Sequence, residues 1–443
     1  MRKTATIALL SCAIIATLRP SLYAADRKLA LLLPQLFGAG GLVVDSEAFL
    51  PGGTTHSAHF NAAFQAQFGP TAAALNSALG RGLAAVASPS PASGFTYAFD
   101  PAAGVFIRSS ESYGPVLGER AETIGRNRLA GALVYQHFEF DRIGEVSLDT
   151  VPFVFTHDSP GPGGREDVVA APLSVSLVQD QATLLLVWGV AETLDLALVF
   201  PVIRTELEAV ARAEVLRLGT TLSPAVHFFR GPGGEYGSTR EYRSAGSATG
   251  VGDLLLRAKK TLKGARGGRG VGVALGLELR VPTGDAENLL GSGAFGVRPL
   301  LIASLSRGRS AVHVNGSYQW NGESVLAGDI VTGTKGSLPD VVRYSMGLDV
   351  GVSKQTTLSL DLLGTHSLGA VRLSHSTFTA LDRITQVPVV EYEAVGTSAL
   401  ELALGAKFNV AGKLLFDTSL LWSLKNDGLR DRFVPLFALE YSF

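Results

Sequence analysis

Residues 432–443, RFVPLFALEYSF, alternate between large apolar side chains and smaller or polar ones. The two sets are Phe433, Phe437, Leu439, Tyr441 and Phe443 on one face, and Val434, Ala438, Glu440 and Ser442 on the other. Because successive side chains of a β-strand point to opposite faces, this spacing predicts a strand with one continuously apolar face.

The same period of two extends through the chain from about Arg128. Residues 271–281 alternate Val and Leu with Gly, Ala, Glu and Arg, and similar runs cover 344–350, 358–362 and 400–408. One such strand also fits a soluble sandwich, so the connections decide the fold class. Short turns are expected at 191–193, 263–269, 307–309, 353–355, 409–412 and 426–430. Longer loops, many of them rich in Gly, are expected at 158–167, 204–249, 282–294, 322–340 and 367–395.

Short turns at one end and long loops at the other are typical of a transmembrane β-barrel. Only the last connection breaks the alternation, because it is short where a long loop is expected. We therefore predict an all-β protein, a transmembrane antiparallel up-and-down β-barrel of about twelve strands. The expected strands are 128–157, 168–190, 193–203, 250–262, 270–281, 295–306, 310–321, 341–352, 356–366, 396–408, 413–425 and 432–443. The first two exceed the 9–11 residues that a bilayer requires, so splitting one of them would give fourteen strands.

The composition agrees with a barrel and excludes other classes. Of 443 residues, 46% are hydrophobic and only 17% are charged, with 51 Gly and a mean hydropathy of +0.26. After the first twenty residues no apolar run reaches the length of about 20 that a transmembrane helix needs. The formal net charge of −1 argues against a nucleic-acid partner.

The first 125 residues differ from the rest of the chain. Residues 1–24 have two basic residues and then an apolar core, which predicts a cleaved signal peptide, and a lipoprotein leader is the alternative. This leader contains Cys12, the one cysteine of the sequence, so no disulfide is expected. Residues 25–125 predict a small, partly helical N-terminal segment, either a plug or a periplasmic extension, before a barrel domain at 126–443. Within it we expect two short amphipathic helices and a hairpin around Asp100 and Pro101.

Three motifs resemble a known family. They are GVGDLLLRAKKTL at 250–262, LGLELRVPTGDAENLLGSG at 275–293 and WGVAETLDLALVFPVI at 188–203. They are similar to the outer-membrane transporter family associated with phenol-degradation meta-pathways, over roughly 185 to 443. The resemblance implies a bacterial outer-membrane barrel and the passage of hydrophobic or aromatic compounds. It supplies no site residues.

Eight charged residues are expected to face the lumen: Asp253, Arg257, Lys259, Glu278, Arg280, Arg343, Asp349 and Glu401. Neighbouring strands place same-face side chains about 5 Å apart, so Asp253 is expected to pair with Arg280, and Glu278 with Arg257 or Lys259. These charges either line a hydrophilic path or pair to offset the cost of burial. Pairing is the simpler interpretation.

Other constellations carry weaker hypotheses. Asp285 and Glu287 are ligand types that suit a calcium site, and His56 with His59 could form half of a metal site. Neither set has enough ligands, so no metal or cofactor is expected. Ser359, Asp361 and His366 contain the residue types of a hydrolase, yet parity places His366 on the opposite face from Asp361. His313 with Asn315 is equally incomplete. The chain is therefore not expected to be an enzyme.

The predicted function is an outer-membrane channel for the passive passage of small hydrophobic or aromatic molecules. The alternative is a structural or surface-interaction barrel without a conducting lumen, which would bind through its long loops. The expected partners are outer-membrane lipid, small hydrophobic solutes and the barrel-assembly machinery, with the protein as a monomer. The terminal aromatic strand, with Leu439, Tyr441 and Phe443 on one face, resembles the signal read by that machinery.

Overall fold

The computed structural model describes most of the chain from residue 111 onward and shorter pieces before it. The described ranges are 28–38, 42–47, 75, 77–80, 82–83, 97–100, 105–108, 111–156, 167–218, 225–265, 269–379 and 383–443. The predicted signal peptide, the first predicted helix, and His56 and His59 lie outside these ranges.

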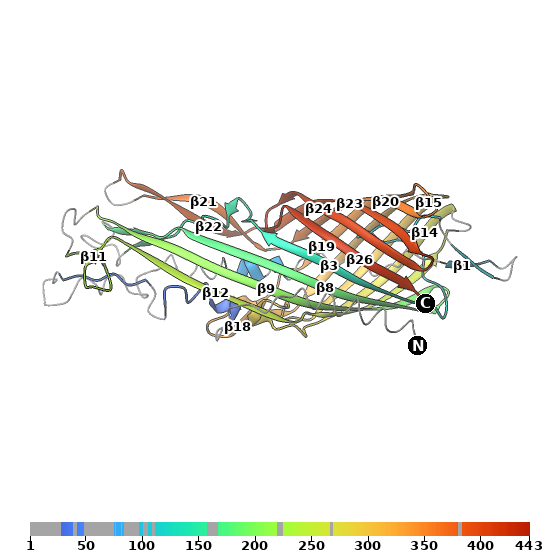
Figure 1. Cartoon of the computed structure of the whole chain (residues 1–443), viewed down its shortest axis with the longest axis horizontal. Coiled ribbons are helices and arrows are strands. Elements are labelled where there is room, and N and C mark those ends of the chain that lie inside the picture. Colours follow the sequence, from blue (N-terminus) through green and yellow to red (C-terminus); the bar gives the residue numbers. More distant parts are fainter. Residues whose placement is uncertain are drawn as a thin grey trace.

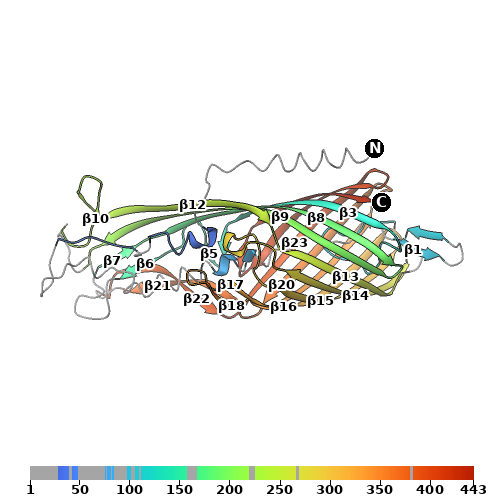
Figure 2. The same ribbon diagram turned by 90° about the horizontal axis from the view of Figure 1, so that it is seen from below.

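In the described residues twelve strands close into an antiparallel barrel (Figures 1 and 2). They are β3 (Leu129–Phe140), β8 (Leu173–Ala191), β9 (Leu194–Leu216), β13 (Leu254–Lys263), β14 (Arg269–Val281), β15 (Gly296–Arg307), β16 (Ser310–Asn321), β19 (Val341–Gly351), β20 (Thr356–Ser367), β23 (Thr397–Ala411), β24 (Leu414–Asn426) and β26 (Phe433–Ser442). β26 pairs with β3, and β13 pairs with β9, so the sheet has no break around the barrel. The predicted fold class and the count of twelve strands are confirmed.

The outer face of the barrel is apolar across its middle. Along β14 the odd-numbered residues point outward, and Leu275 and Leu277 are about half exposed, at 47% and 46%. Other outward-facing apolar side chains are Leu184, Leu196, Leu256, Leu301, Leu305, Val314, Met346, Leu348, Leu358, Leu360, Leu404 and Leu420. An exposed apolar surface of this extent suits lipid and not water.

Aromatic side chains border this apolar surface at both ends of the strands. Trp320, Trp422 and Phe433 are exposed near the end with the long connections, which we name the loop end. Trp188 and Phe443 are exposed near the opposite end, which has the short turns and is named the turn end. Two aromatic girdles separated by an apolar band are typical of transmembrane barrels. No helix in the described part of the chain is long and apolar enough to cross a bilayer.

β8 and β9 continue well beyond the barrel at the loop end, where β12 (Thr239–Val251) joins them (Figure 1). Lower β9 pairs with β13, from Leu194 to Val199, and upper β9 pairs with β12, from Val202 to Glu214. The prediction of a loop over 204–249 is therefore wrong for most of its length. From Arg204 onward most outward side chains of β9 are charged, which is the pattern of a sheet surface that faces water.

The remaining strands are short or project from the loop end, apart from the first hairpin. They are β1 (Tyr97–Asp100), β2 (Val105–Arg108), β4 (Arg142–Ile143), β5 (Val146–Ser147), β6 (Val154–Thr156), β7 (Val168–Ala170), β10 (Phe229–Arg230), β11 (Tyr236–Gly237), β17 (Glu323–Asp329), β18 (Thr334–Ser337), β21 (Val371–Thr379), β22 (Gln386–Ala394) and β25 (Leu429–Arg430). The hairpin predicted around Asp100 is present as β1 and β2, at the turn end (Figure 2). A single strand over 128–157 is wrong, because the chain leaves the barrel after Phe140 and forms β4 to β6. The predicted loop at 367–395 contains the hairpin of β21 and β22.

The first pieces of the chain pack at the loop end of the lumen. A 3₁₀-helix, η1 (Leu29–Leu31), contacts a second one, η3 (Ala286–Asn288), in the loop after β14. The described positions between 75 and 83 are helical, which agrees with the second predicted helix. In that helix Leu75 and Leu79 are buried. A Cβ at Gly82 would overlap Leu429, so only glycine permits this close approach.

Candidate functional site

Residues 112–125, which we name the strap, cross the barrel lumen near its turn end. Every residue of the strap is buried. At one end the phenol of Tyr113 donates a hydrogen bond to the carbonyl of Lys354, in the turn before β20, at 2.9 Å. At the other end the amide of Ile124 donates to Asp195 of β9 at 3.1 Å. β20 and β9 lie on different sides of the barrel, so the strap spans the lumen between them.

Two consecutive charged residues hold the middle of the strap to different walls. Glu119 forms an ion pair with Arg257 of β13. Arg120 forms one with Asp349 of β19, and its Nε lies 3.2 Å from Oδ1 of that carboxylate. The four side chains are at most 9% exposed. Buried charges are stable only when they are paired, so these two contacts fix the strap in place.

The strap also uses its main chain. Its amides donate to wall side chains, as that of Ala121 does to Ser304 at 2.8 Å. Its carbonyls accept, and Nζ of Lys259 lies 2.8 Å from the oxygen of Glu122. Buried main-chain groups need such partners, and here the polar inner wall supplies them.

His313 of β16 and Asp361 of β20 meet across the strand between them. Nε2 of His313 lies 2.6 Å from Oδ1 of Asp361, and both side chains are fully buried. β19 places Gly347 in register between the two, and a Cβ there would overlap both groups. Gly118 of the strap covers the same contact, again with no room for a Cβ. These glycines let the pair form beneath the strap.

The structure places most of the charges selected from the sequence in ion pairs. Asp253 lies 3.8 Å from Arg280, and Glu278 lies 4.0 Å from Arg257, as expected from the strand pairing. Glu278 has a closer partner in Arg298, at 2.6 Å. The expected alternative of Lys259 with Glu278 is not formed, because Lys259 lies 3.9 Å from Asp195 instead. Asp349 pairs with the strap, and Lys407 pairs with Asp417 at 3.2 Å.

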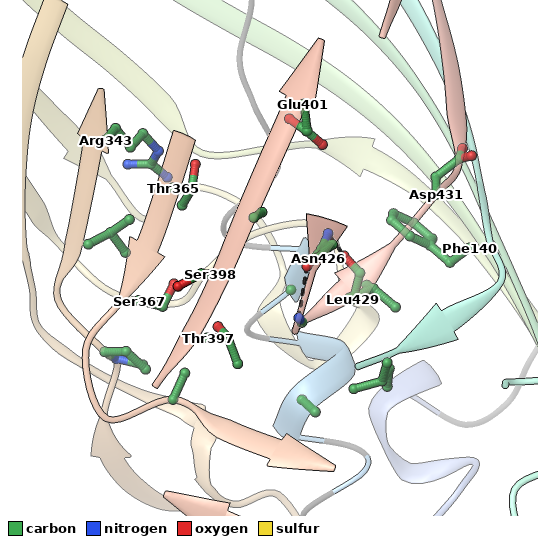
Figure 3. A pocket seen from close by; sticks show the side chains of 18 of the residues that line it. Phe140, Arg343, Thr365, Ser367, Thr397, Ser398, Glu401, Asn426, Leu429 and Asp431 are labelled. Carbon is green, nitrogen blue, oxygen red and sulfur yellow. Dashed lines mark hydrogen bonds between the residues drawn. The ribbon is translucent and has the colours of Figure 1, made fainter. Parts of the chain in front are cut away.

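The last two residues of that set, Arg343 and Glu401, line a cavity of about 130 Å³ in the loop-end half of the lumen (Figure 3). Phe140, Leu421 and Val434 give it an apolar side. Hydroxyl groups of four residues also reach it: Thr365, Ser367, Thr397 and Ser398. The cavity therefore combines an apolar surface with many hydroxyl, amide and charged groups, and such polar groups can fix the orientation of a small organic molecule.

Asp431 is another acidic residue of this cavity, in the short connection before β26. Its carboxylate accepts hydrogen bonds from the amides of Glu139 and Phe433, at 2.7 and 2.9 Å. Burial raises the pKa of Asp431, and the nearby Asp141 adds to this. The lumen contacts of the strap and of Asp431 were not anticipated from the sequence, because neither residue set follows the alternation that marks a strand face.

The weaker site hypotheses find little support in the geometry. Asp285 and Glu287 face Lys28, whose Nζ lies 2.8 and 3.8 Å from their oxygens. Nδ1 of His366 lies 2.9 Å from Oγ of Ser398, whereas Asp361 pairs with His313. In the described ranges no three His, Cys, Asp or Glu side chains are grouped as metal ligands.

The residues of the terminal strand lie on the outer face of β26. The rings of Tyr441 and Phe443 are 4.9 Å apart in an edge-on arrangement. Leu439 lies opposite Leu133 of β3, at the seam where the barrel closes.

Comparison with family models finds a match to the middle of the chain. Residues 158–369 match the family model described as the putative MetA-pathway of phenol degradation. The resemblance seen in the sequence is confirmed. No curated protein matches the sequence.

Many solved structures are similar to the chain at low sequence identity. An outer-membrane channel from Pseudomonas putida F1 is 15% identical, with 73% of this chain and 98% of that chain covered and a TM-score of 0.45. The translocator domain of the autotransporter NalP from Neisseria meningitidis is 10% identical, with 72% and 89% covered and a TM-score of 0.32. A FadL homologue from Pseudomonas aeruginosa is also 10% identical, with 72% and 90% covered and a TM-score of 0.32.

Proposed function

We propose that the protein is a bacterial outer-membrane channel through which small apolar or aromatic molecules pass without energy input. The observation that carries this proposal is the cavity of about 130 Å³ inside the lumen. A cavity of about 150 Å³ in a protein core accommodates benzene, so this one suits a single ring or a short chain. The sequence has no nucleotide-binding motif, which is why we propose passive passage.

The membrane position follows from the outer face of the barrel. The apolar band between the two aromatic girdles is the surface that would contact lipid, and the charged face of upper β9 would stand above it. Short turns of such barrels face the periplasm and long loops face outward. We therefore assign the turn end, with the strap, to the periplasmic side and the cavity to the outer side.

Passage then requires the strap to move. A solute in the cavity has the buried strap between it and the turn end, held by Glu119 and Arg120. The strap is a single extended segment, so a shift of its middle opens the lumen without unfolding the barrel. The proposed N-terminal region at 25–125 thus acts as a plug through its last residues.

A reversible disulfide tests this arrangement. A Cβ built at Gly272 lies 3.0 Å from that of Ala121 in the strap, so a shift of about 1 Å gives disulfide geometry. Cys12 is the only native cysteine and lies in the predicted leader, so Ala121→Cys with Gly272→Cys forms the one engineered pair. Uptake of radiolabelled toluene is measured in intact bacteria that produce the full chain in their outer membrane.

We expect the oxidised pair to reduce uptake to the level of cells with an empty vector, and a reducing agent to restore it. The two single-cysteine variants serve as controls and should not respond to oxidation. Uptake that never exceeds the empty vector, for wild type or reduced variant, would refute the channel and favour a structural or surface-interaction barrel. Uptake that is unaffected by the disulfide would place the path elsewhere.

A further inference from the structure

The cavity contains a cationic group, Arg343, that Glu278 attracts from a distance but that forms no ion pair within 4.0 Å among the described residues. Five other basic residues of the inner wall each have a carboxylate oxygen within 4.0 Å. They are Arg257, Lys259, Arg280, Arg298 and Lys407. Among the described residues no carboxylate lies that close to Arg343, which instead donates a hydrogen bond to the neutral amide of Gln319. Arg343 points into the cavity from β19 (Figure 3).

The cavity also contains an acidic group without a cationic partner. Glu401 reaches it from β23, two strands along the barrel wall from β19 (Figure 3). In the described ranges no Lys, Arg or His nitrogen lies within 4.0 Å of its carboxylate, and Asp431 adds a second acidic group on that side. One end of the cavity is therefore basic and the other acidic.

Arg343 and Glu401 determine which groups of a bound molecule can lie at each end of the cavity. Arginine stays charged in proteins, and its planar group binds a carboxylate through two parallel hydrogen bonds. An acidic residue at the opposite end accepts a hydrogen bond from a neutral hydroxyl but repels a second anion. The same cavity also presents the apolar surface of Phe138, Phe140 and Leu421 to a ring, from strands that follow β23 around the barrel.

We propose that this cavity binds a monocyclic aromatic carboxylate, with the carboxylate at Arg343 and a neutral hydrogen-bond donor toward Glu401. The inference rests on the proposed function and adds a preferred solute class, aromatic monoacids, to the apolar rings that are expected to pass. A ring of this kind matches the cavity in size, since about 130 Å³ leaves room for one ring and its substituents. A dicarboxylate of the same length would place its second charge beside Glu401 and is excluded.

Equilibrium dialysis of the full chain in detergent tests the proposal directly. The labelled probe is 4-hydroxybenzoate, and the competitors are 4-methylphenol, which lacks the carboxylate, and terephthalate, which has two. For wild type we expect 4-hydroxybenzoate to bind at least tenfold more tightly than either competitor. Arg343→Gln should weaken 4-hydroxybenzoate at least tenfold and change 4-methylphenol less than twofold.

The control variant is Arg309→Gln, which removes a guanidinium that is half exposed at the turn end and should leave all three affinities unchanged. Glu401→Gln should strengthen terephthalate at least tenfold, because it removes the repelling charge. If Arg343→Gln does not fold, Arg343→Lys keeps the charge without the planar fork and should lower the affinity for 4-hydroxybenzoate several-fold.

Two outcomes overturn the proposal. In the first, wild type binds 4-hydroxybenzoate and 4-methylphenol with equal affinity. In the second, Arg343→Gln lowers the affinities for both compounds by the same factor. The proposed function fails independently of this result, since it fails when toluene does not enter cells. Toluene uptake without binding of 4-hydroxybenzoate would refute the acid specificity alone. Selective binding without toluene uptake would support the site and refute the channel.

Discussion

Replacing Arg120 with Met removes the charge that ties the strap to β19 and keeps most of the side-chain volume. The Arg120 guanidinium is 4% exposed, and its partner Asp349 is fully buried. The same guanidinium donates to Oγ of Ser112 at 2.6 Å, so one side chain joins the strap to itself and to the wall. The substitution leaves Asp349 beside His313, 3.7 Å away, without its arginine.

The magnitude follows from burial. Removing one partner of a buried ion pair costs about 3–5 kcal/mol, because the other charge remains buried and uncompensated. An exposed pair is worth about 0–1 kcal/mol. The chain offers such a pair next to the strap, Glu111 with Arg309 at 3.8 Å, with side chains that are 71% and 48% exposed. Since about 1.4 kcal/mol is a factor of ten, Arg120→Met should raise the population of the displaced strap roughly 100- to 4000-fold.

Maleimide labelling of a buried cysteine measures that population. In an Ala121→Cys background the thiol is inaccessible while the strap is in place, because Ala121 is fully buried. We expect Arg120→Met to accelerate labelling by about 100-fold or more. The matched Glu111→Gln variant should stay within about fivefold of the parent. Equal rates in Arg120→Met and its parent would show that the main-chain hydrogen bonds alone hold the strap.

Two further predictions concern the lipid-facing surface and the contact between η1 and η3. Leu275→Arg, in the middle of the apolar band, should lower the free energy of unfolding from lipid vesicles by about 2–4 kcal/mol, whereas Glu206→Arg above that band should change it by less than about 1 kcal/mol. Burial raises the pKa of Asp285, but hydrogen bonds from Lys28 and Asn288 outweigh it and hold the pKa below its usual value of 3.8. A lowered pKa in the folded protein means that this contact stabilises above about pH 4 and is lost as the pH falls through the folded value. Hydrogen exchange of η1, corrected for intrinsic rates, should therefore accelerate below pH 4 in wild type, and Lys28→Met should abolish this dependence.

The barrel was predictable from the sequence because lipid on one side and a polar lumen on the other impose strict alternation. The expected strands 270–281 and 310–321 match β14 and β16 within a residue. The alternation also marks upper β9, where small Ala209, Ala211 and Ala213 point inward and charged residues point outward. The sequence predicts a loop there because the segment lies between two short turns, whereas in the structure the strand continues with a mostly charged outer face.

The lumen contacts were predictable only between neighbouring strands. Asp253 with Arg280 follows from strand order and side-chain parity, whereas Arg120 with Asp349 joins residues 229 positions apart through a segment without periodicity. The pair of His313 and Asp361 is an intermediate case. Its signal in the sequence is Gly347, an inward-facing glycine in register between two polar residues on the flanking strands.

In the channel that we propose, the charges along the lumen link the strap to the kind of solute that would pass. At the turn end the strap neutralises Arg257 and Asp349, so its displacement uncovers one cation and one anion at once. Uncovering both is costly unless water enters, so the closed state dominates and a steady ionic leak is not expected. At the loop end Arg343 and Glu401 stay unneutralised, because no strap residue among those described pairs with them. In the channel that we propose, a bound monoacid would supply the carboxylate that pairs with Arg343, so the cavity would select by charge while the strap controls the passage.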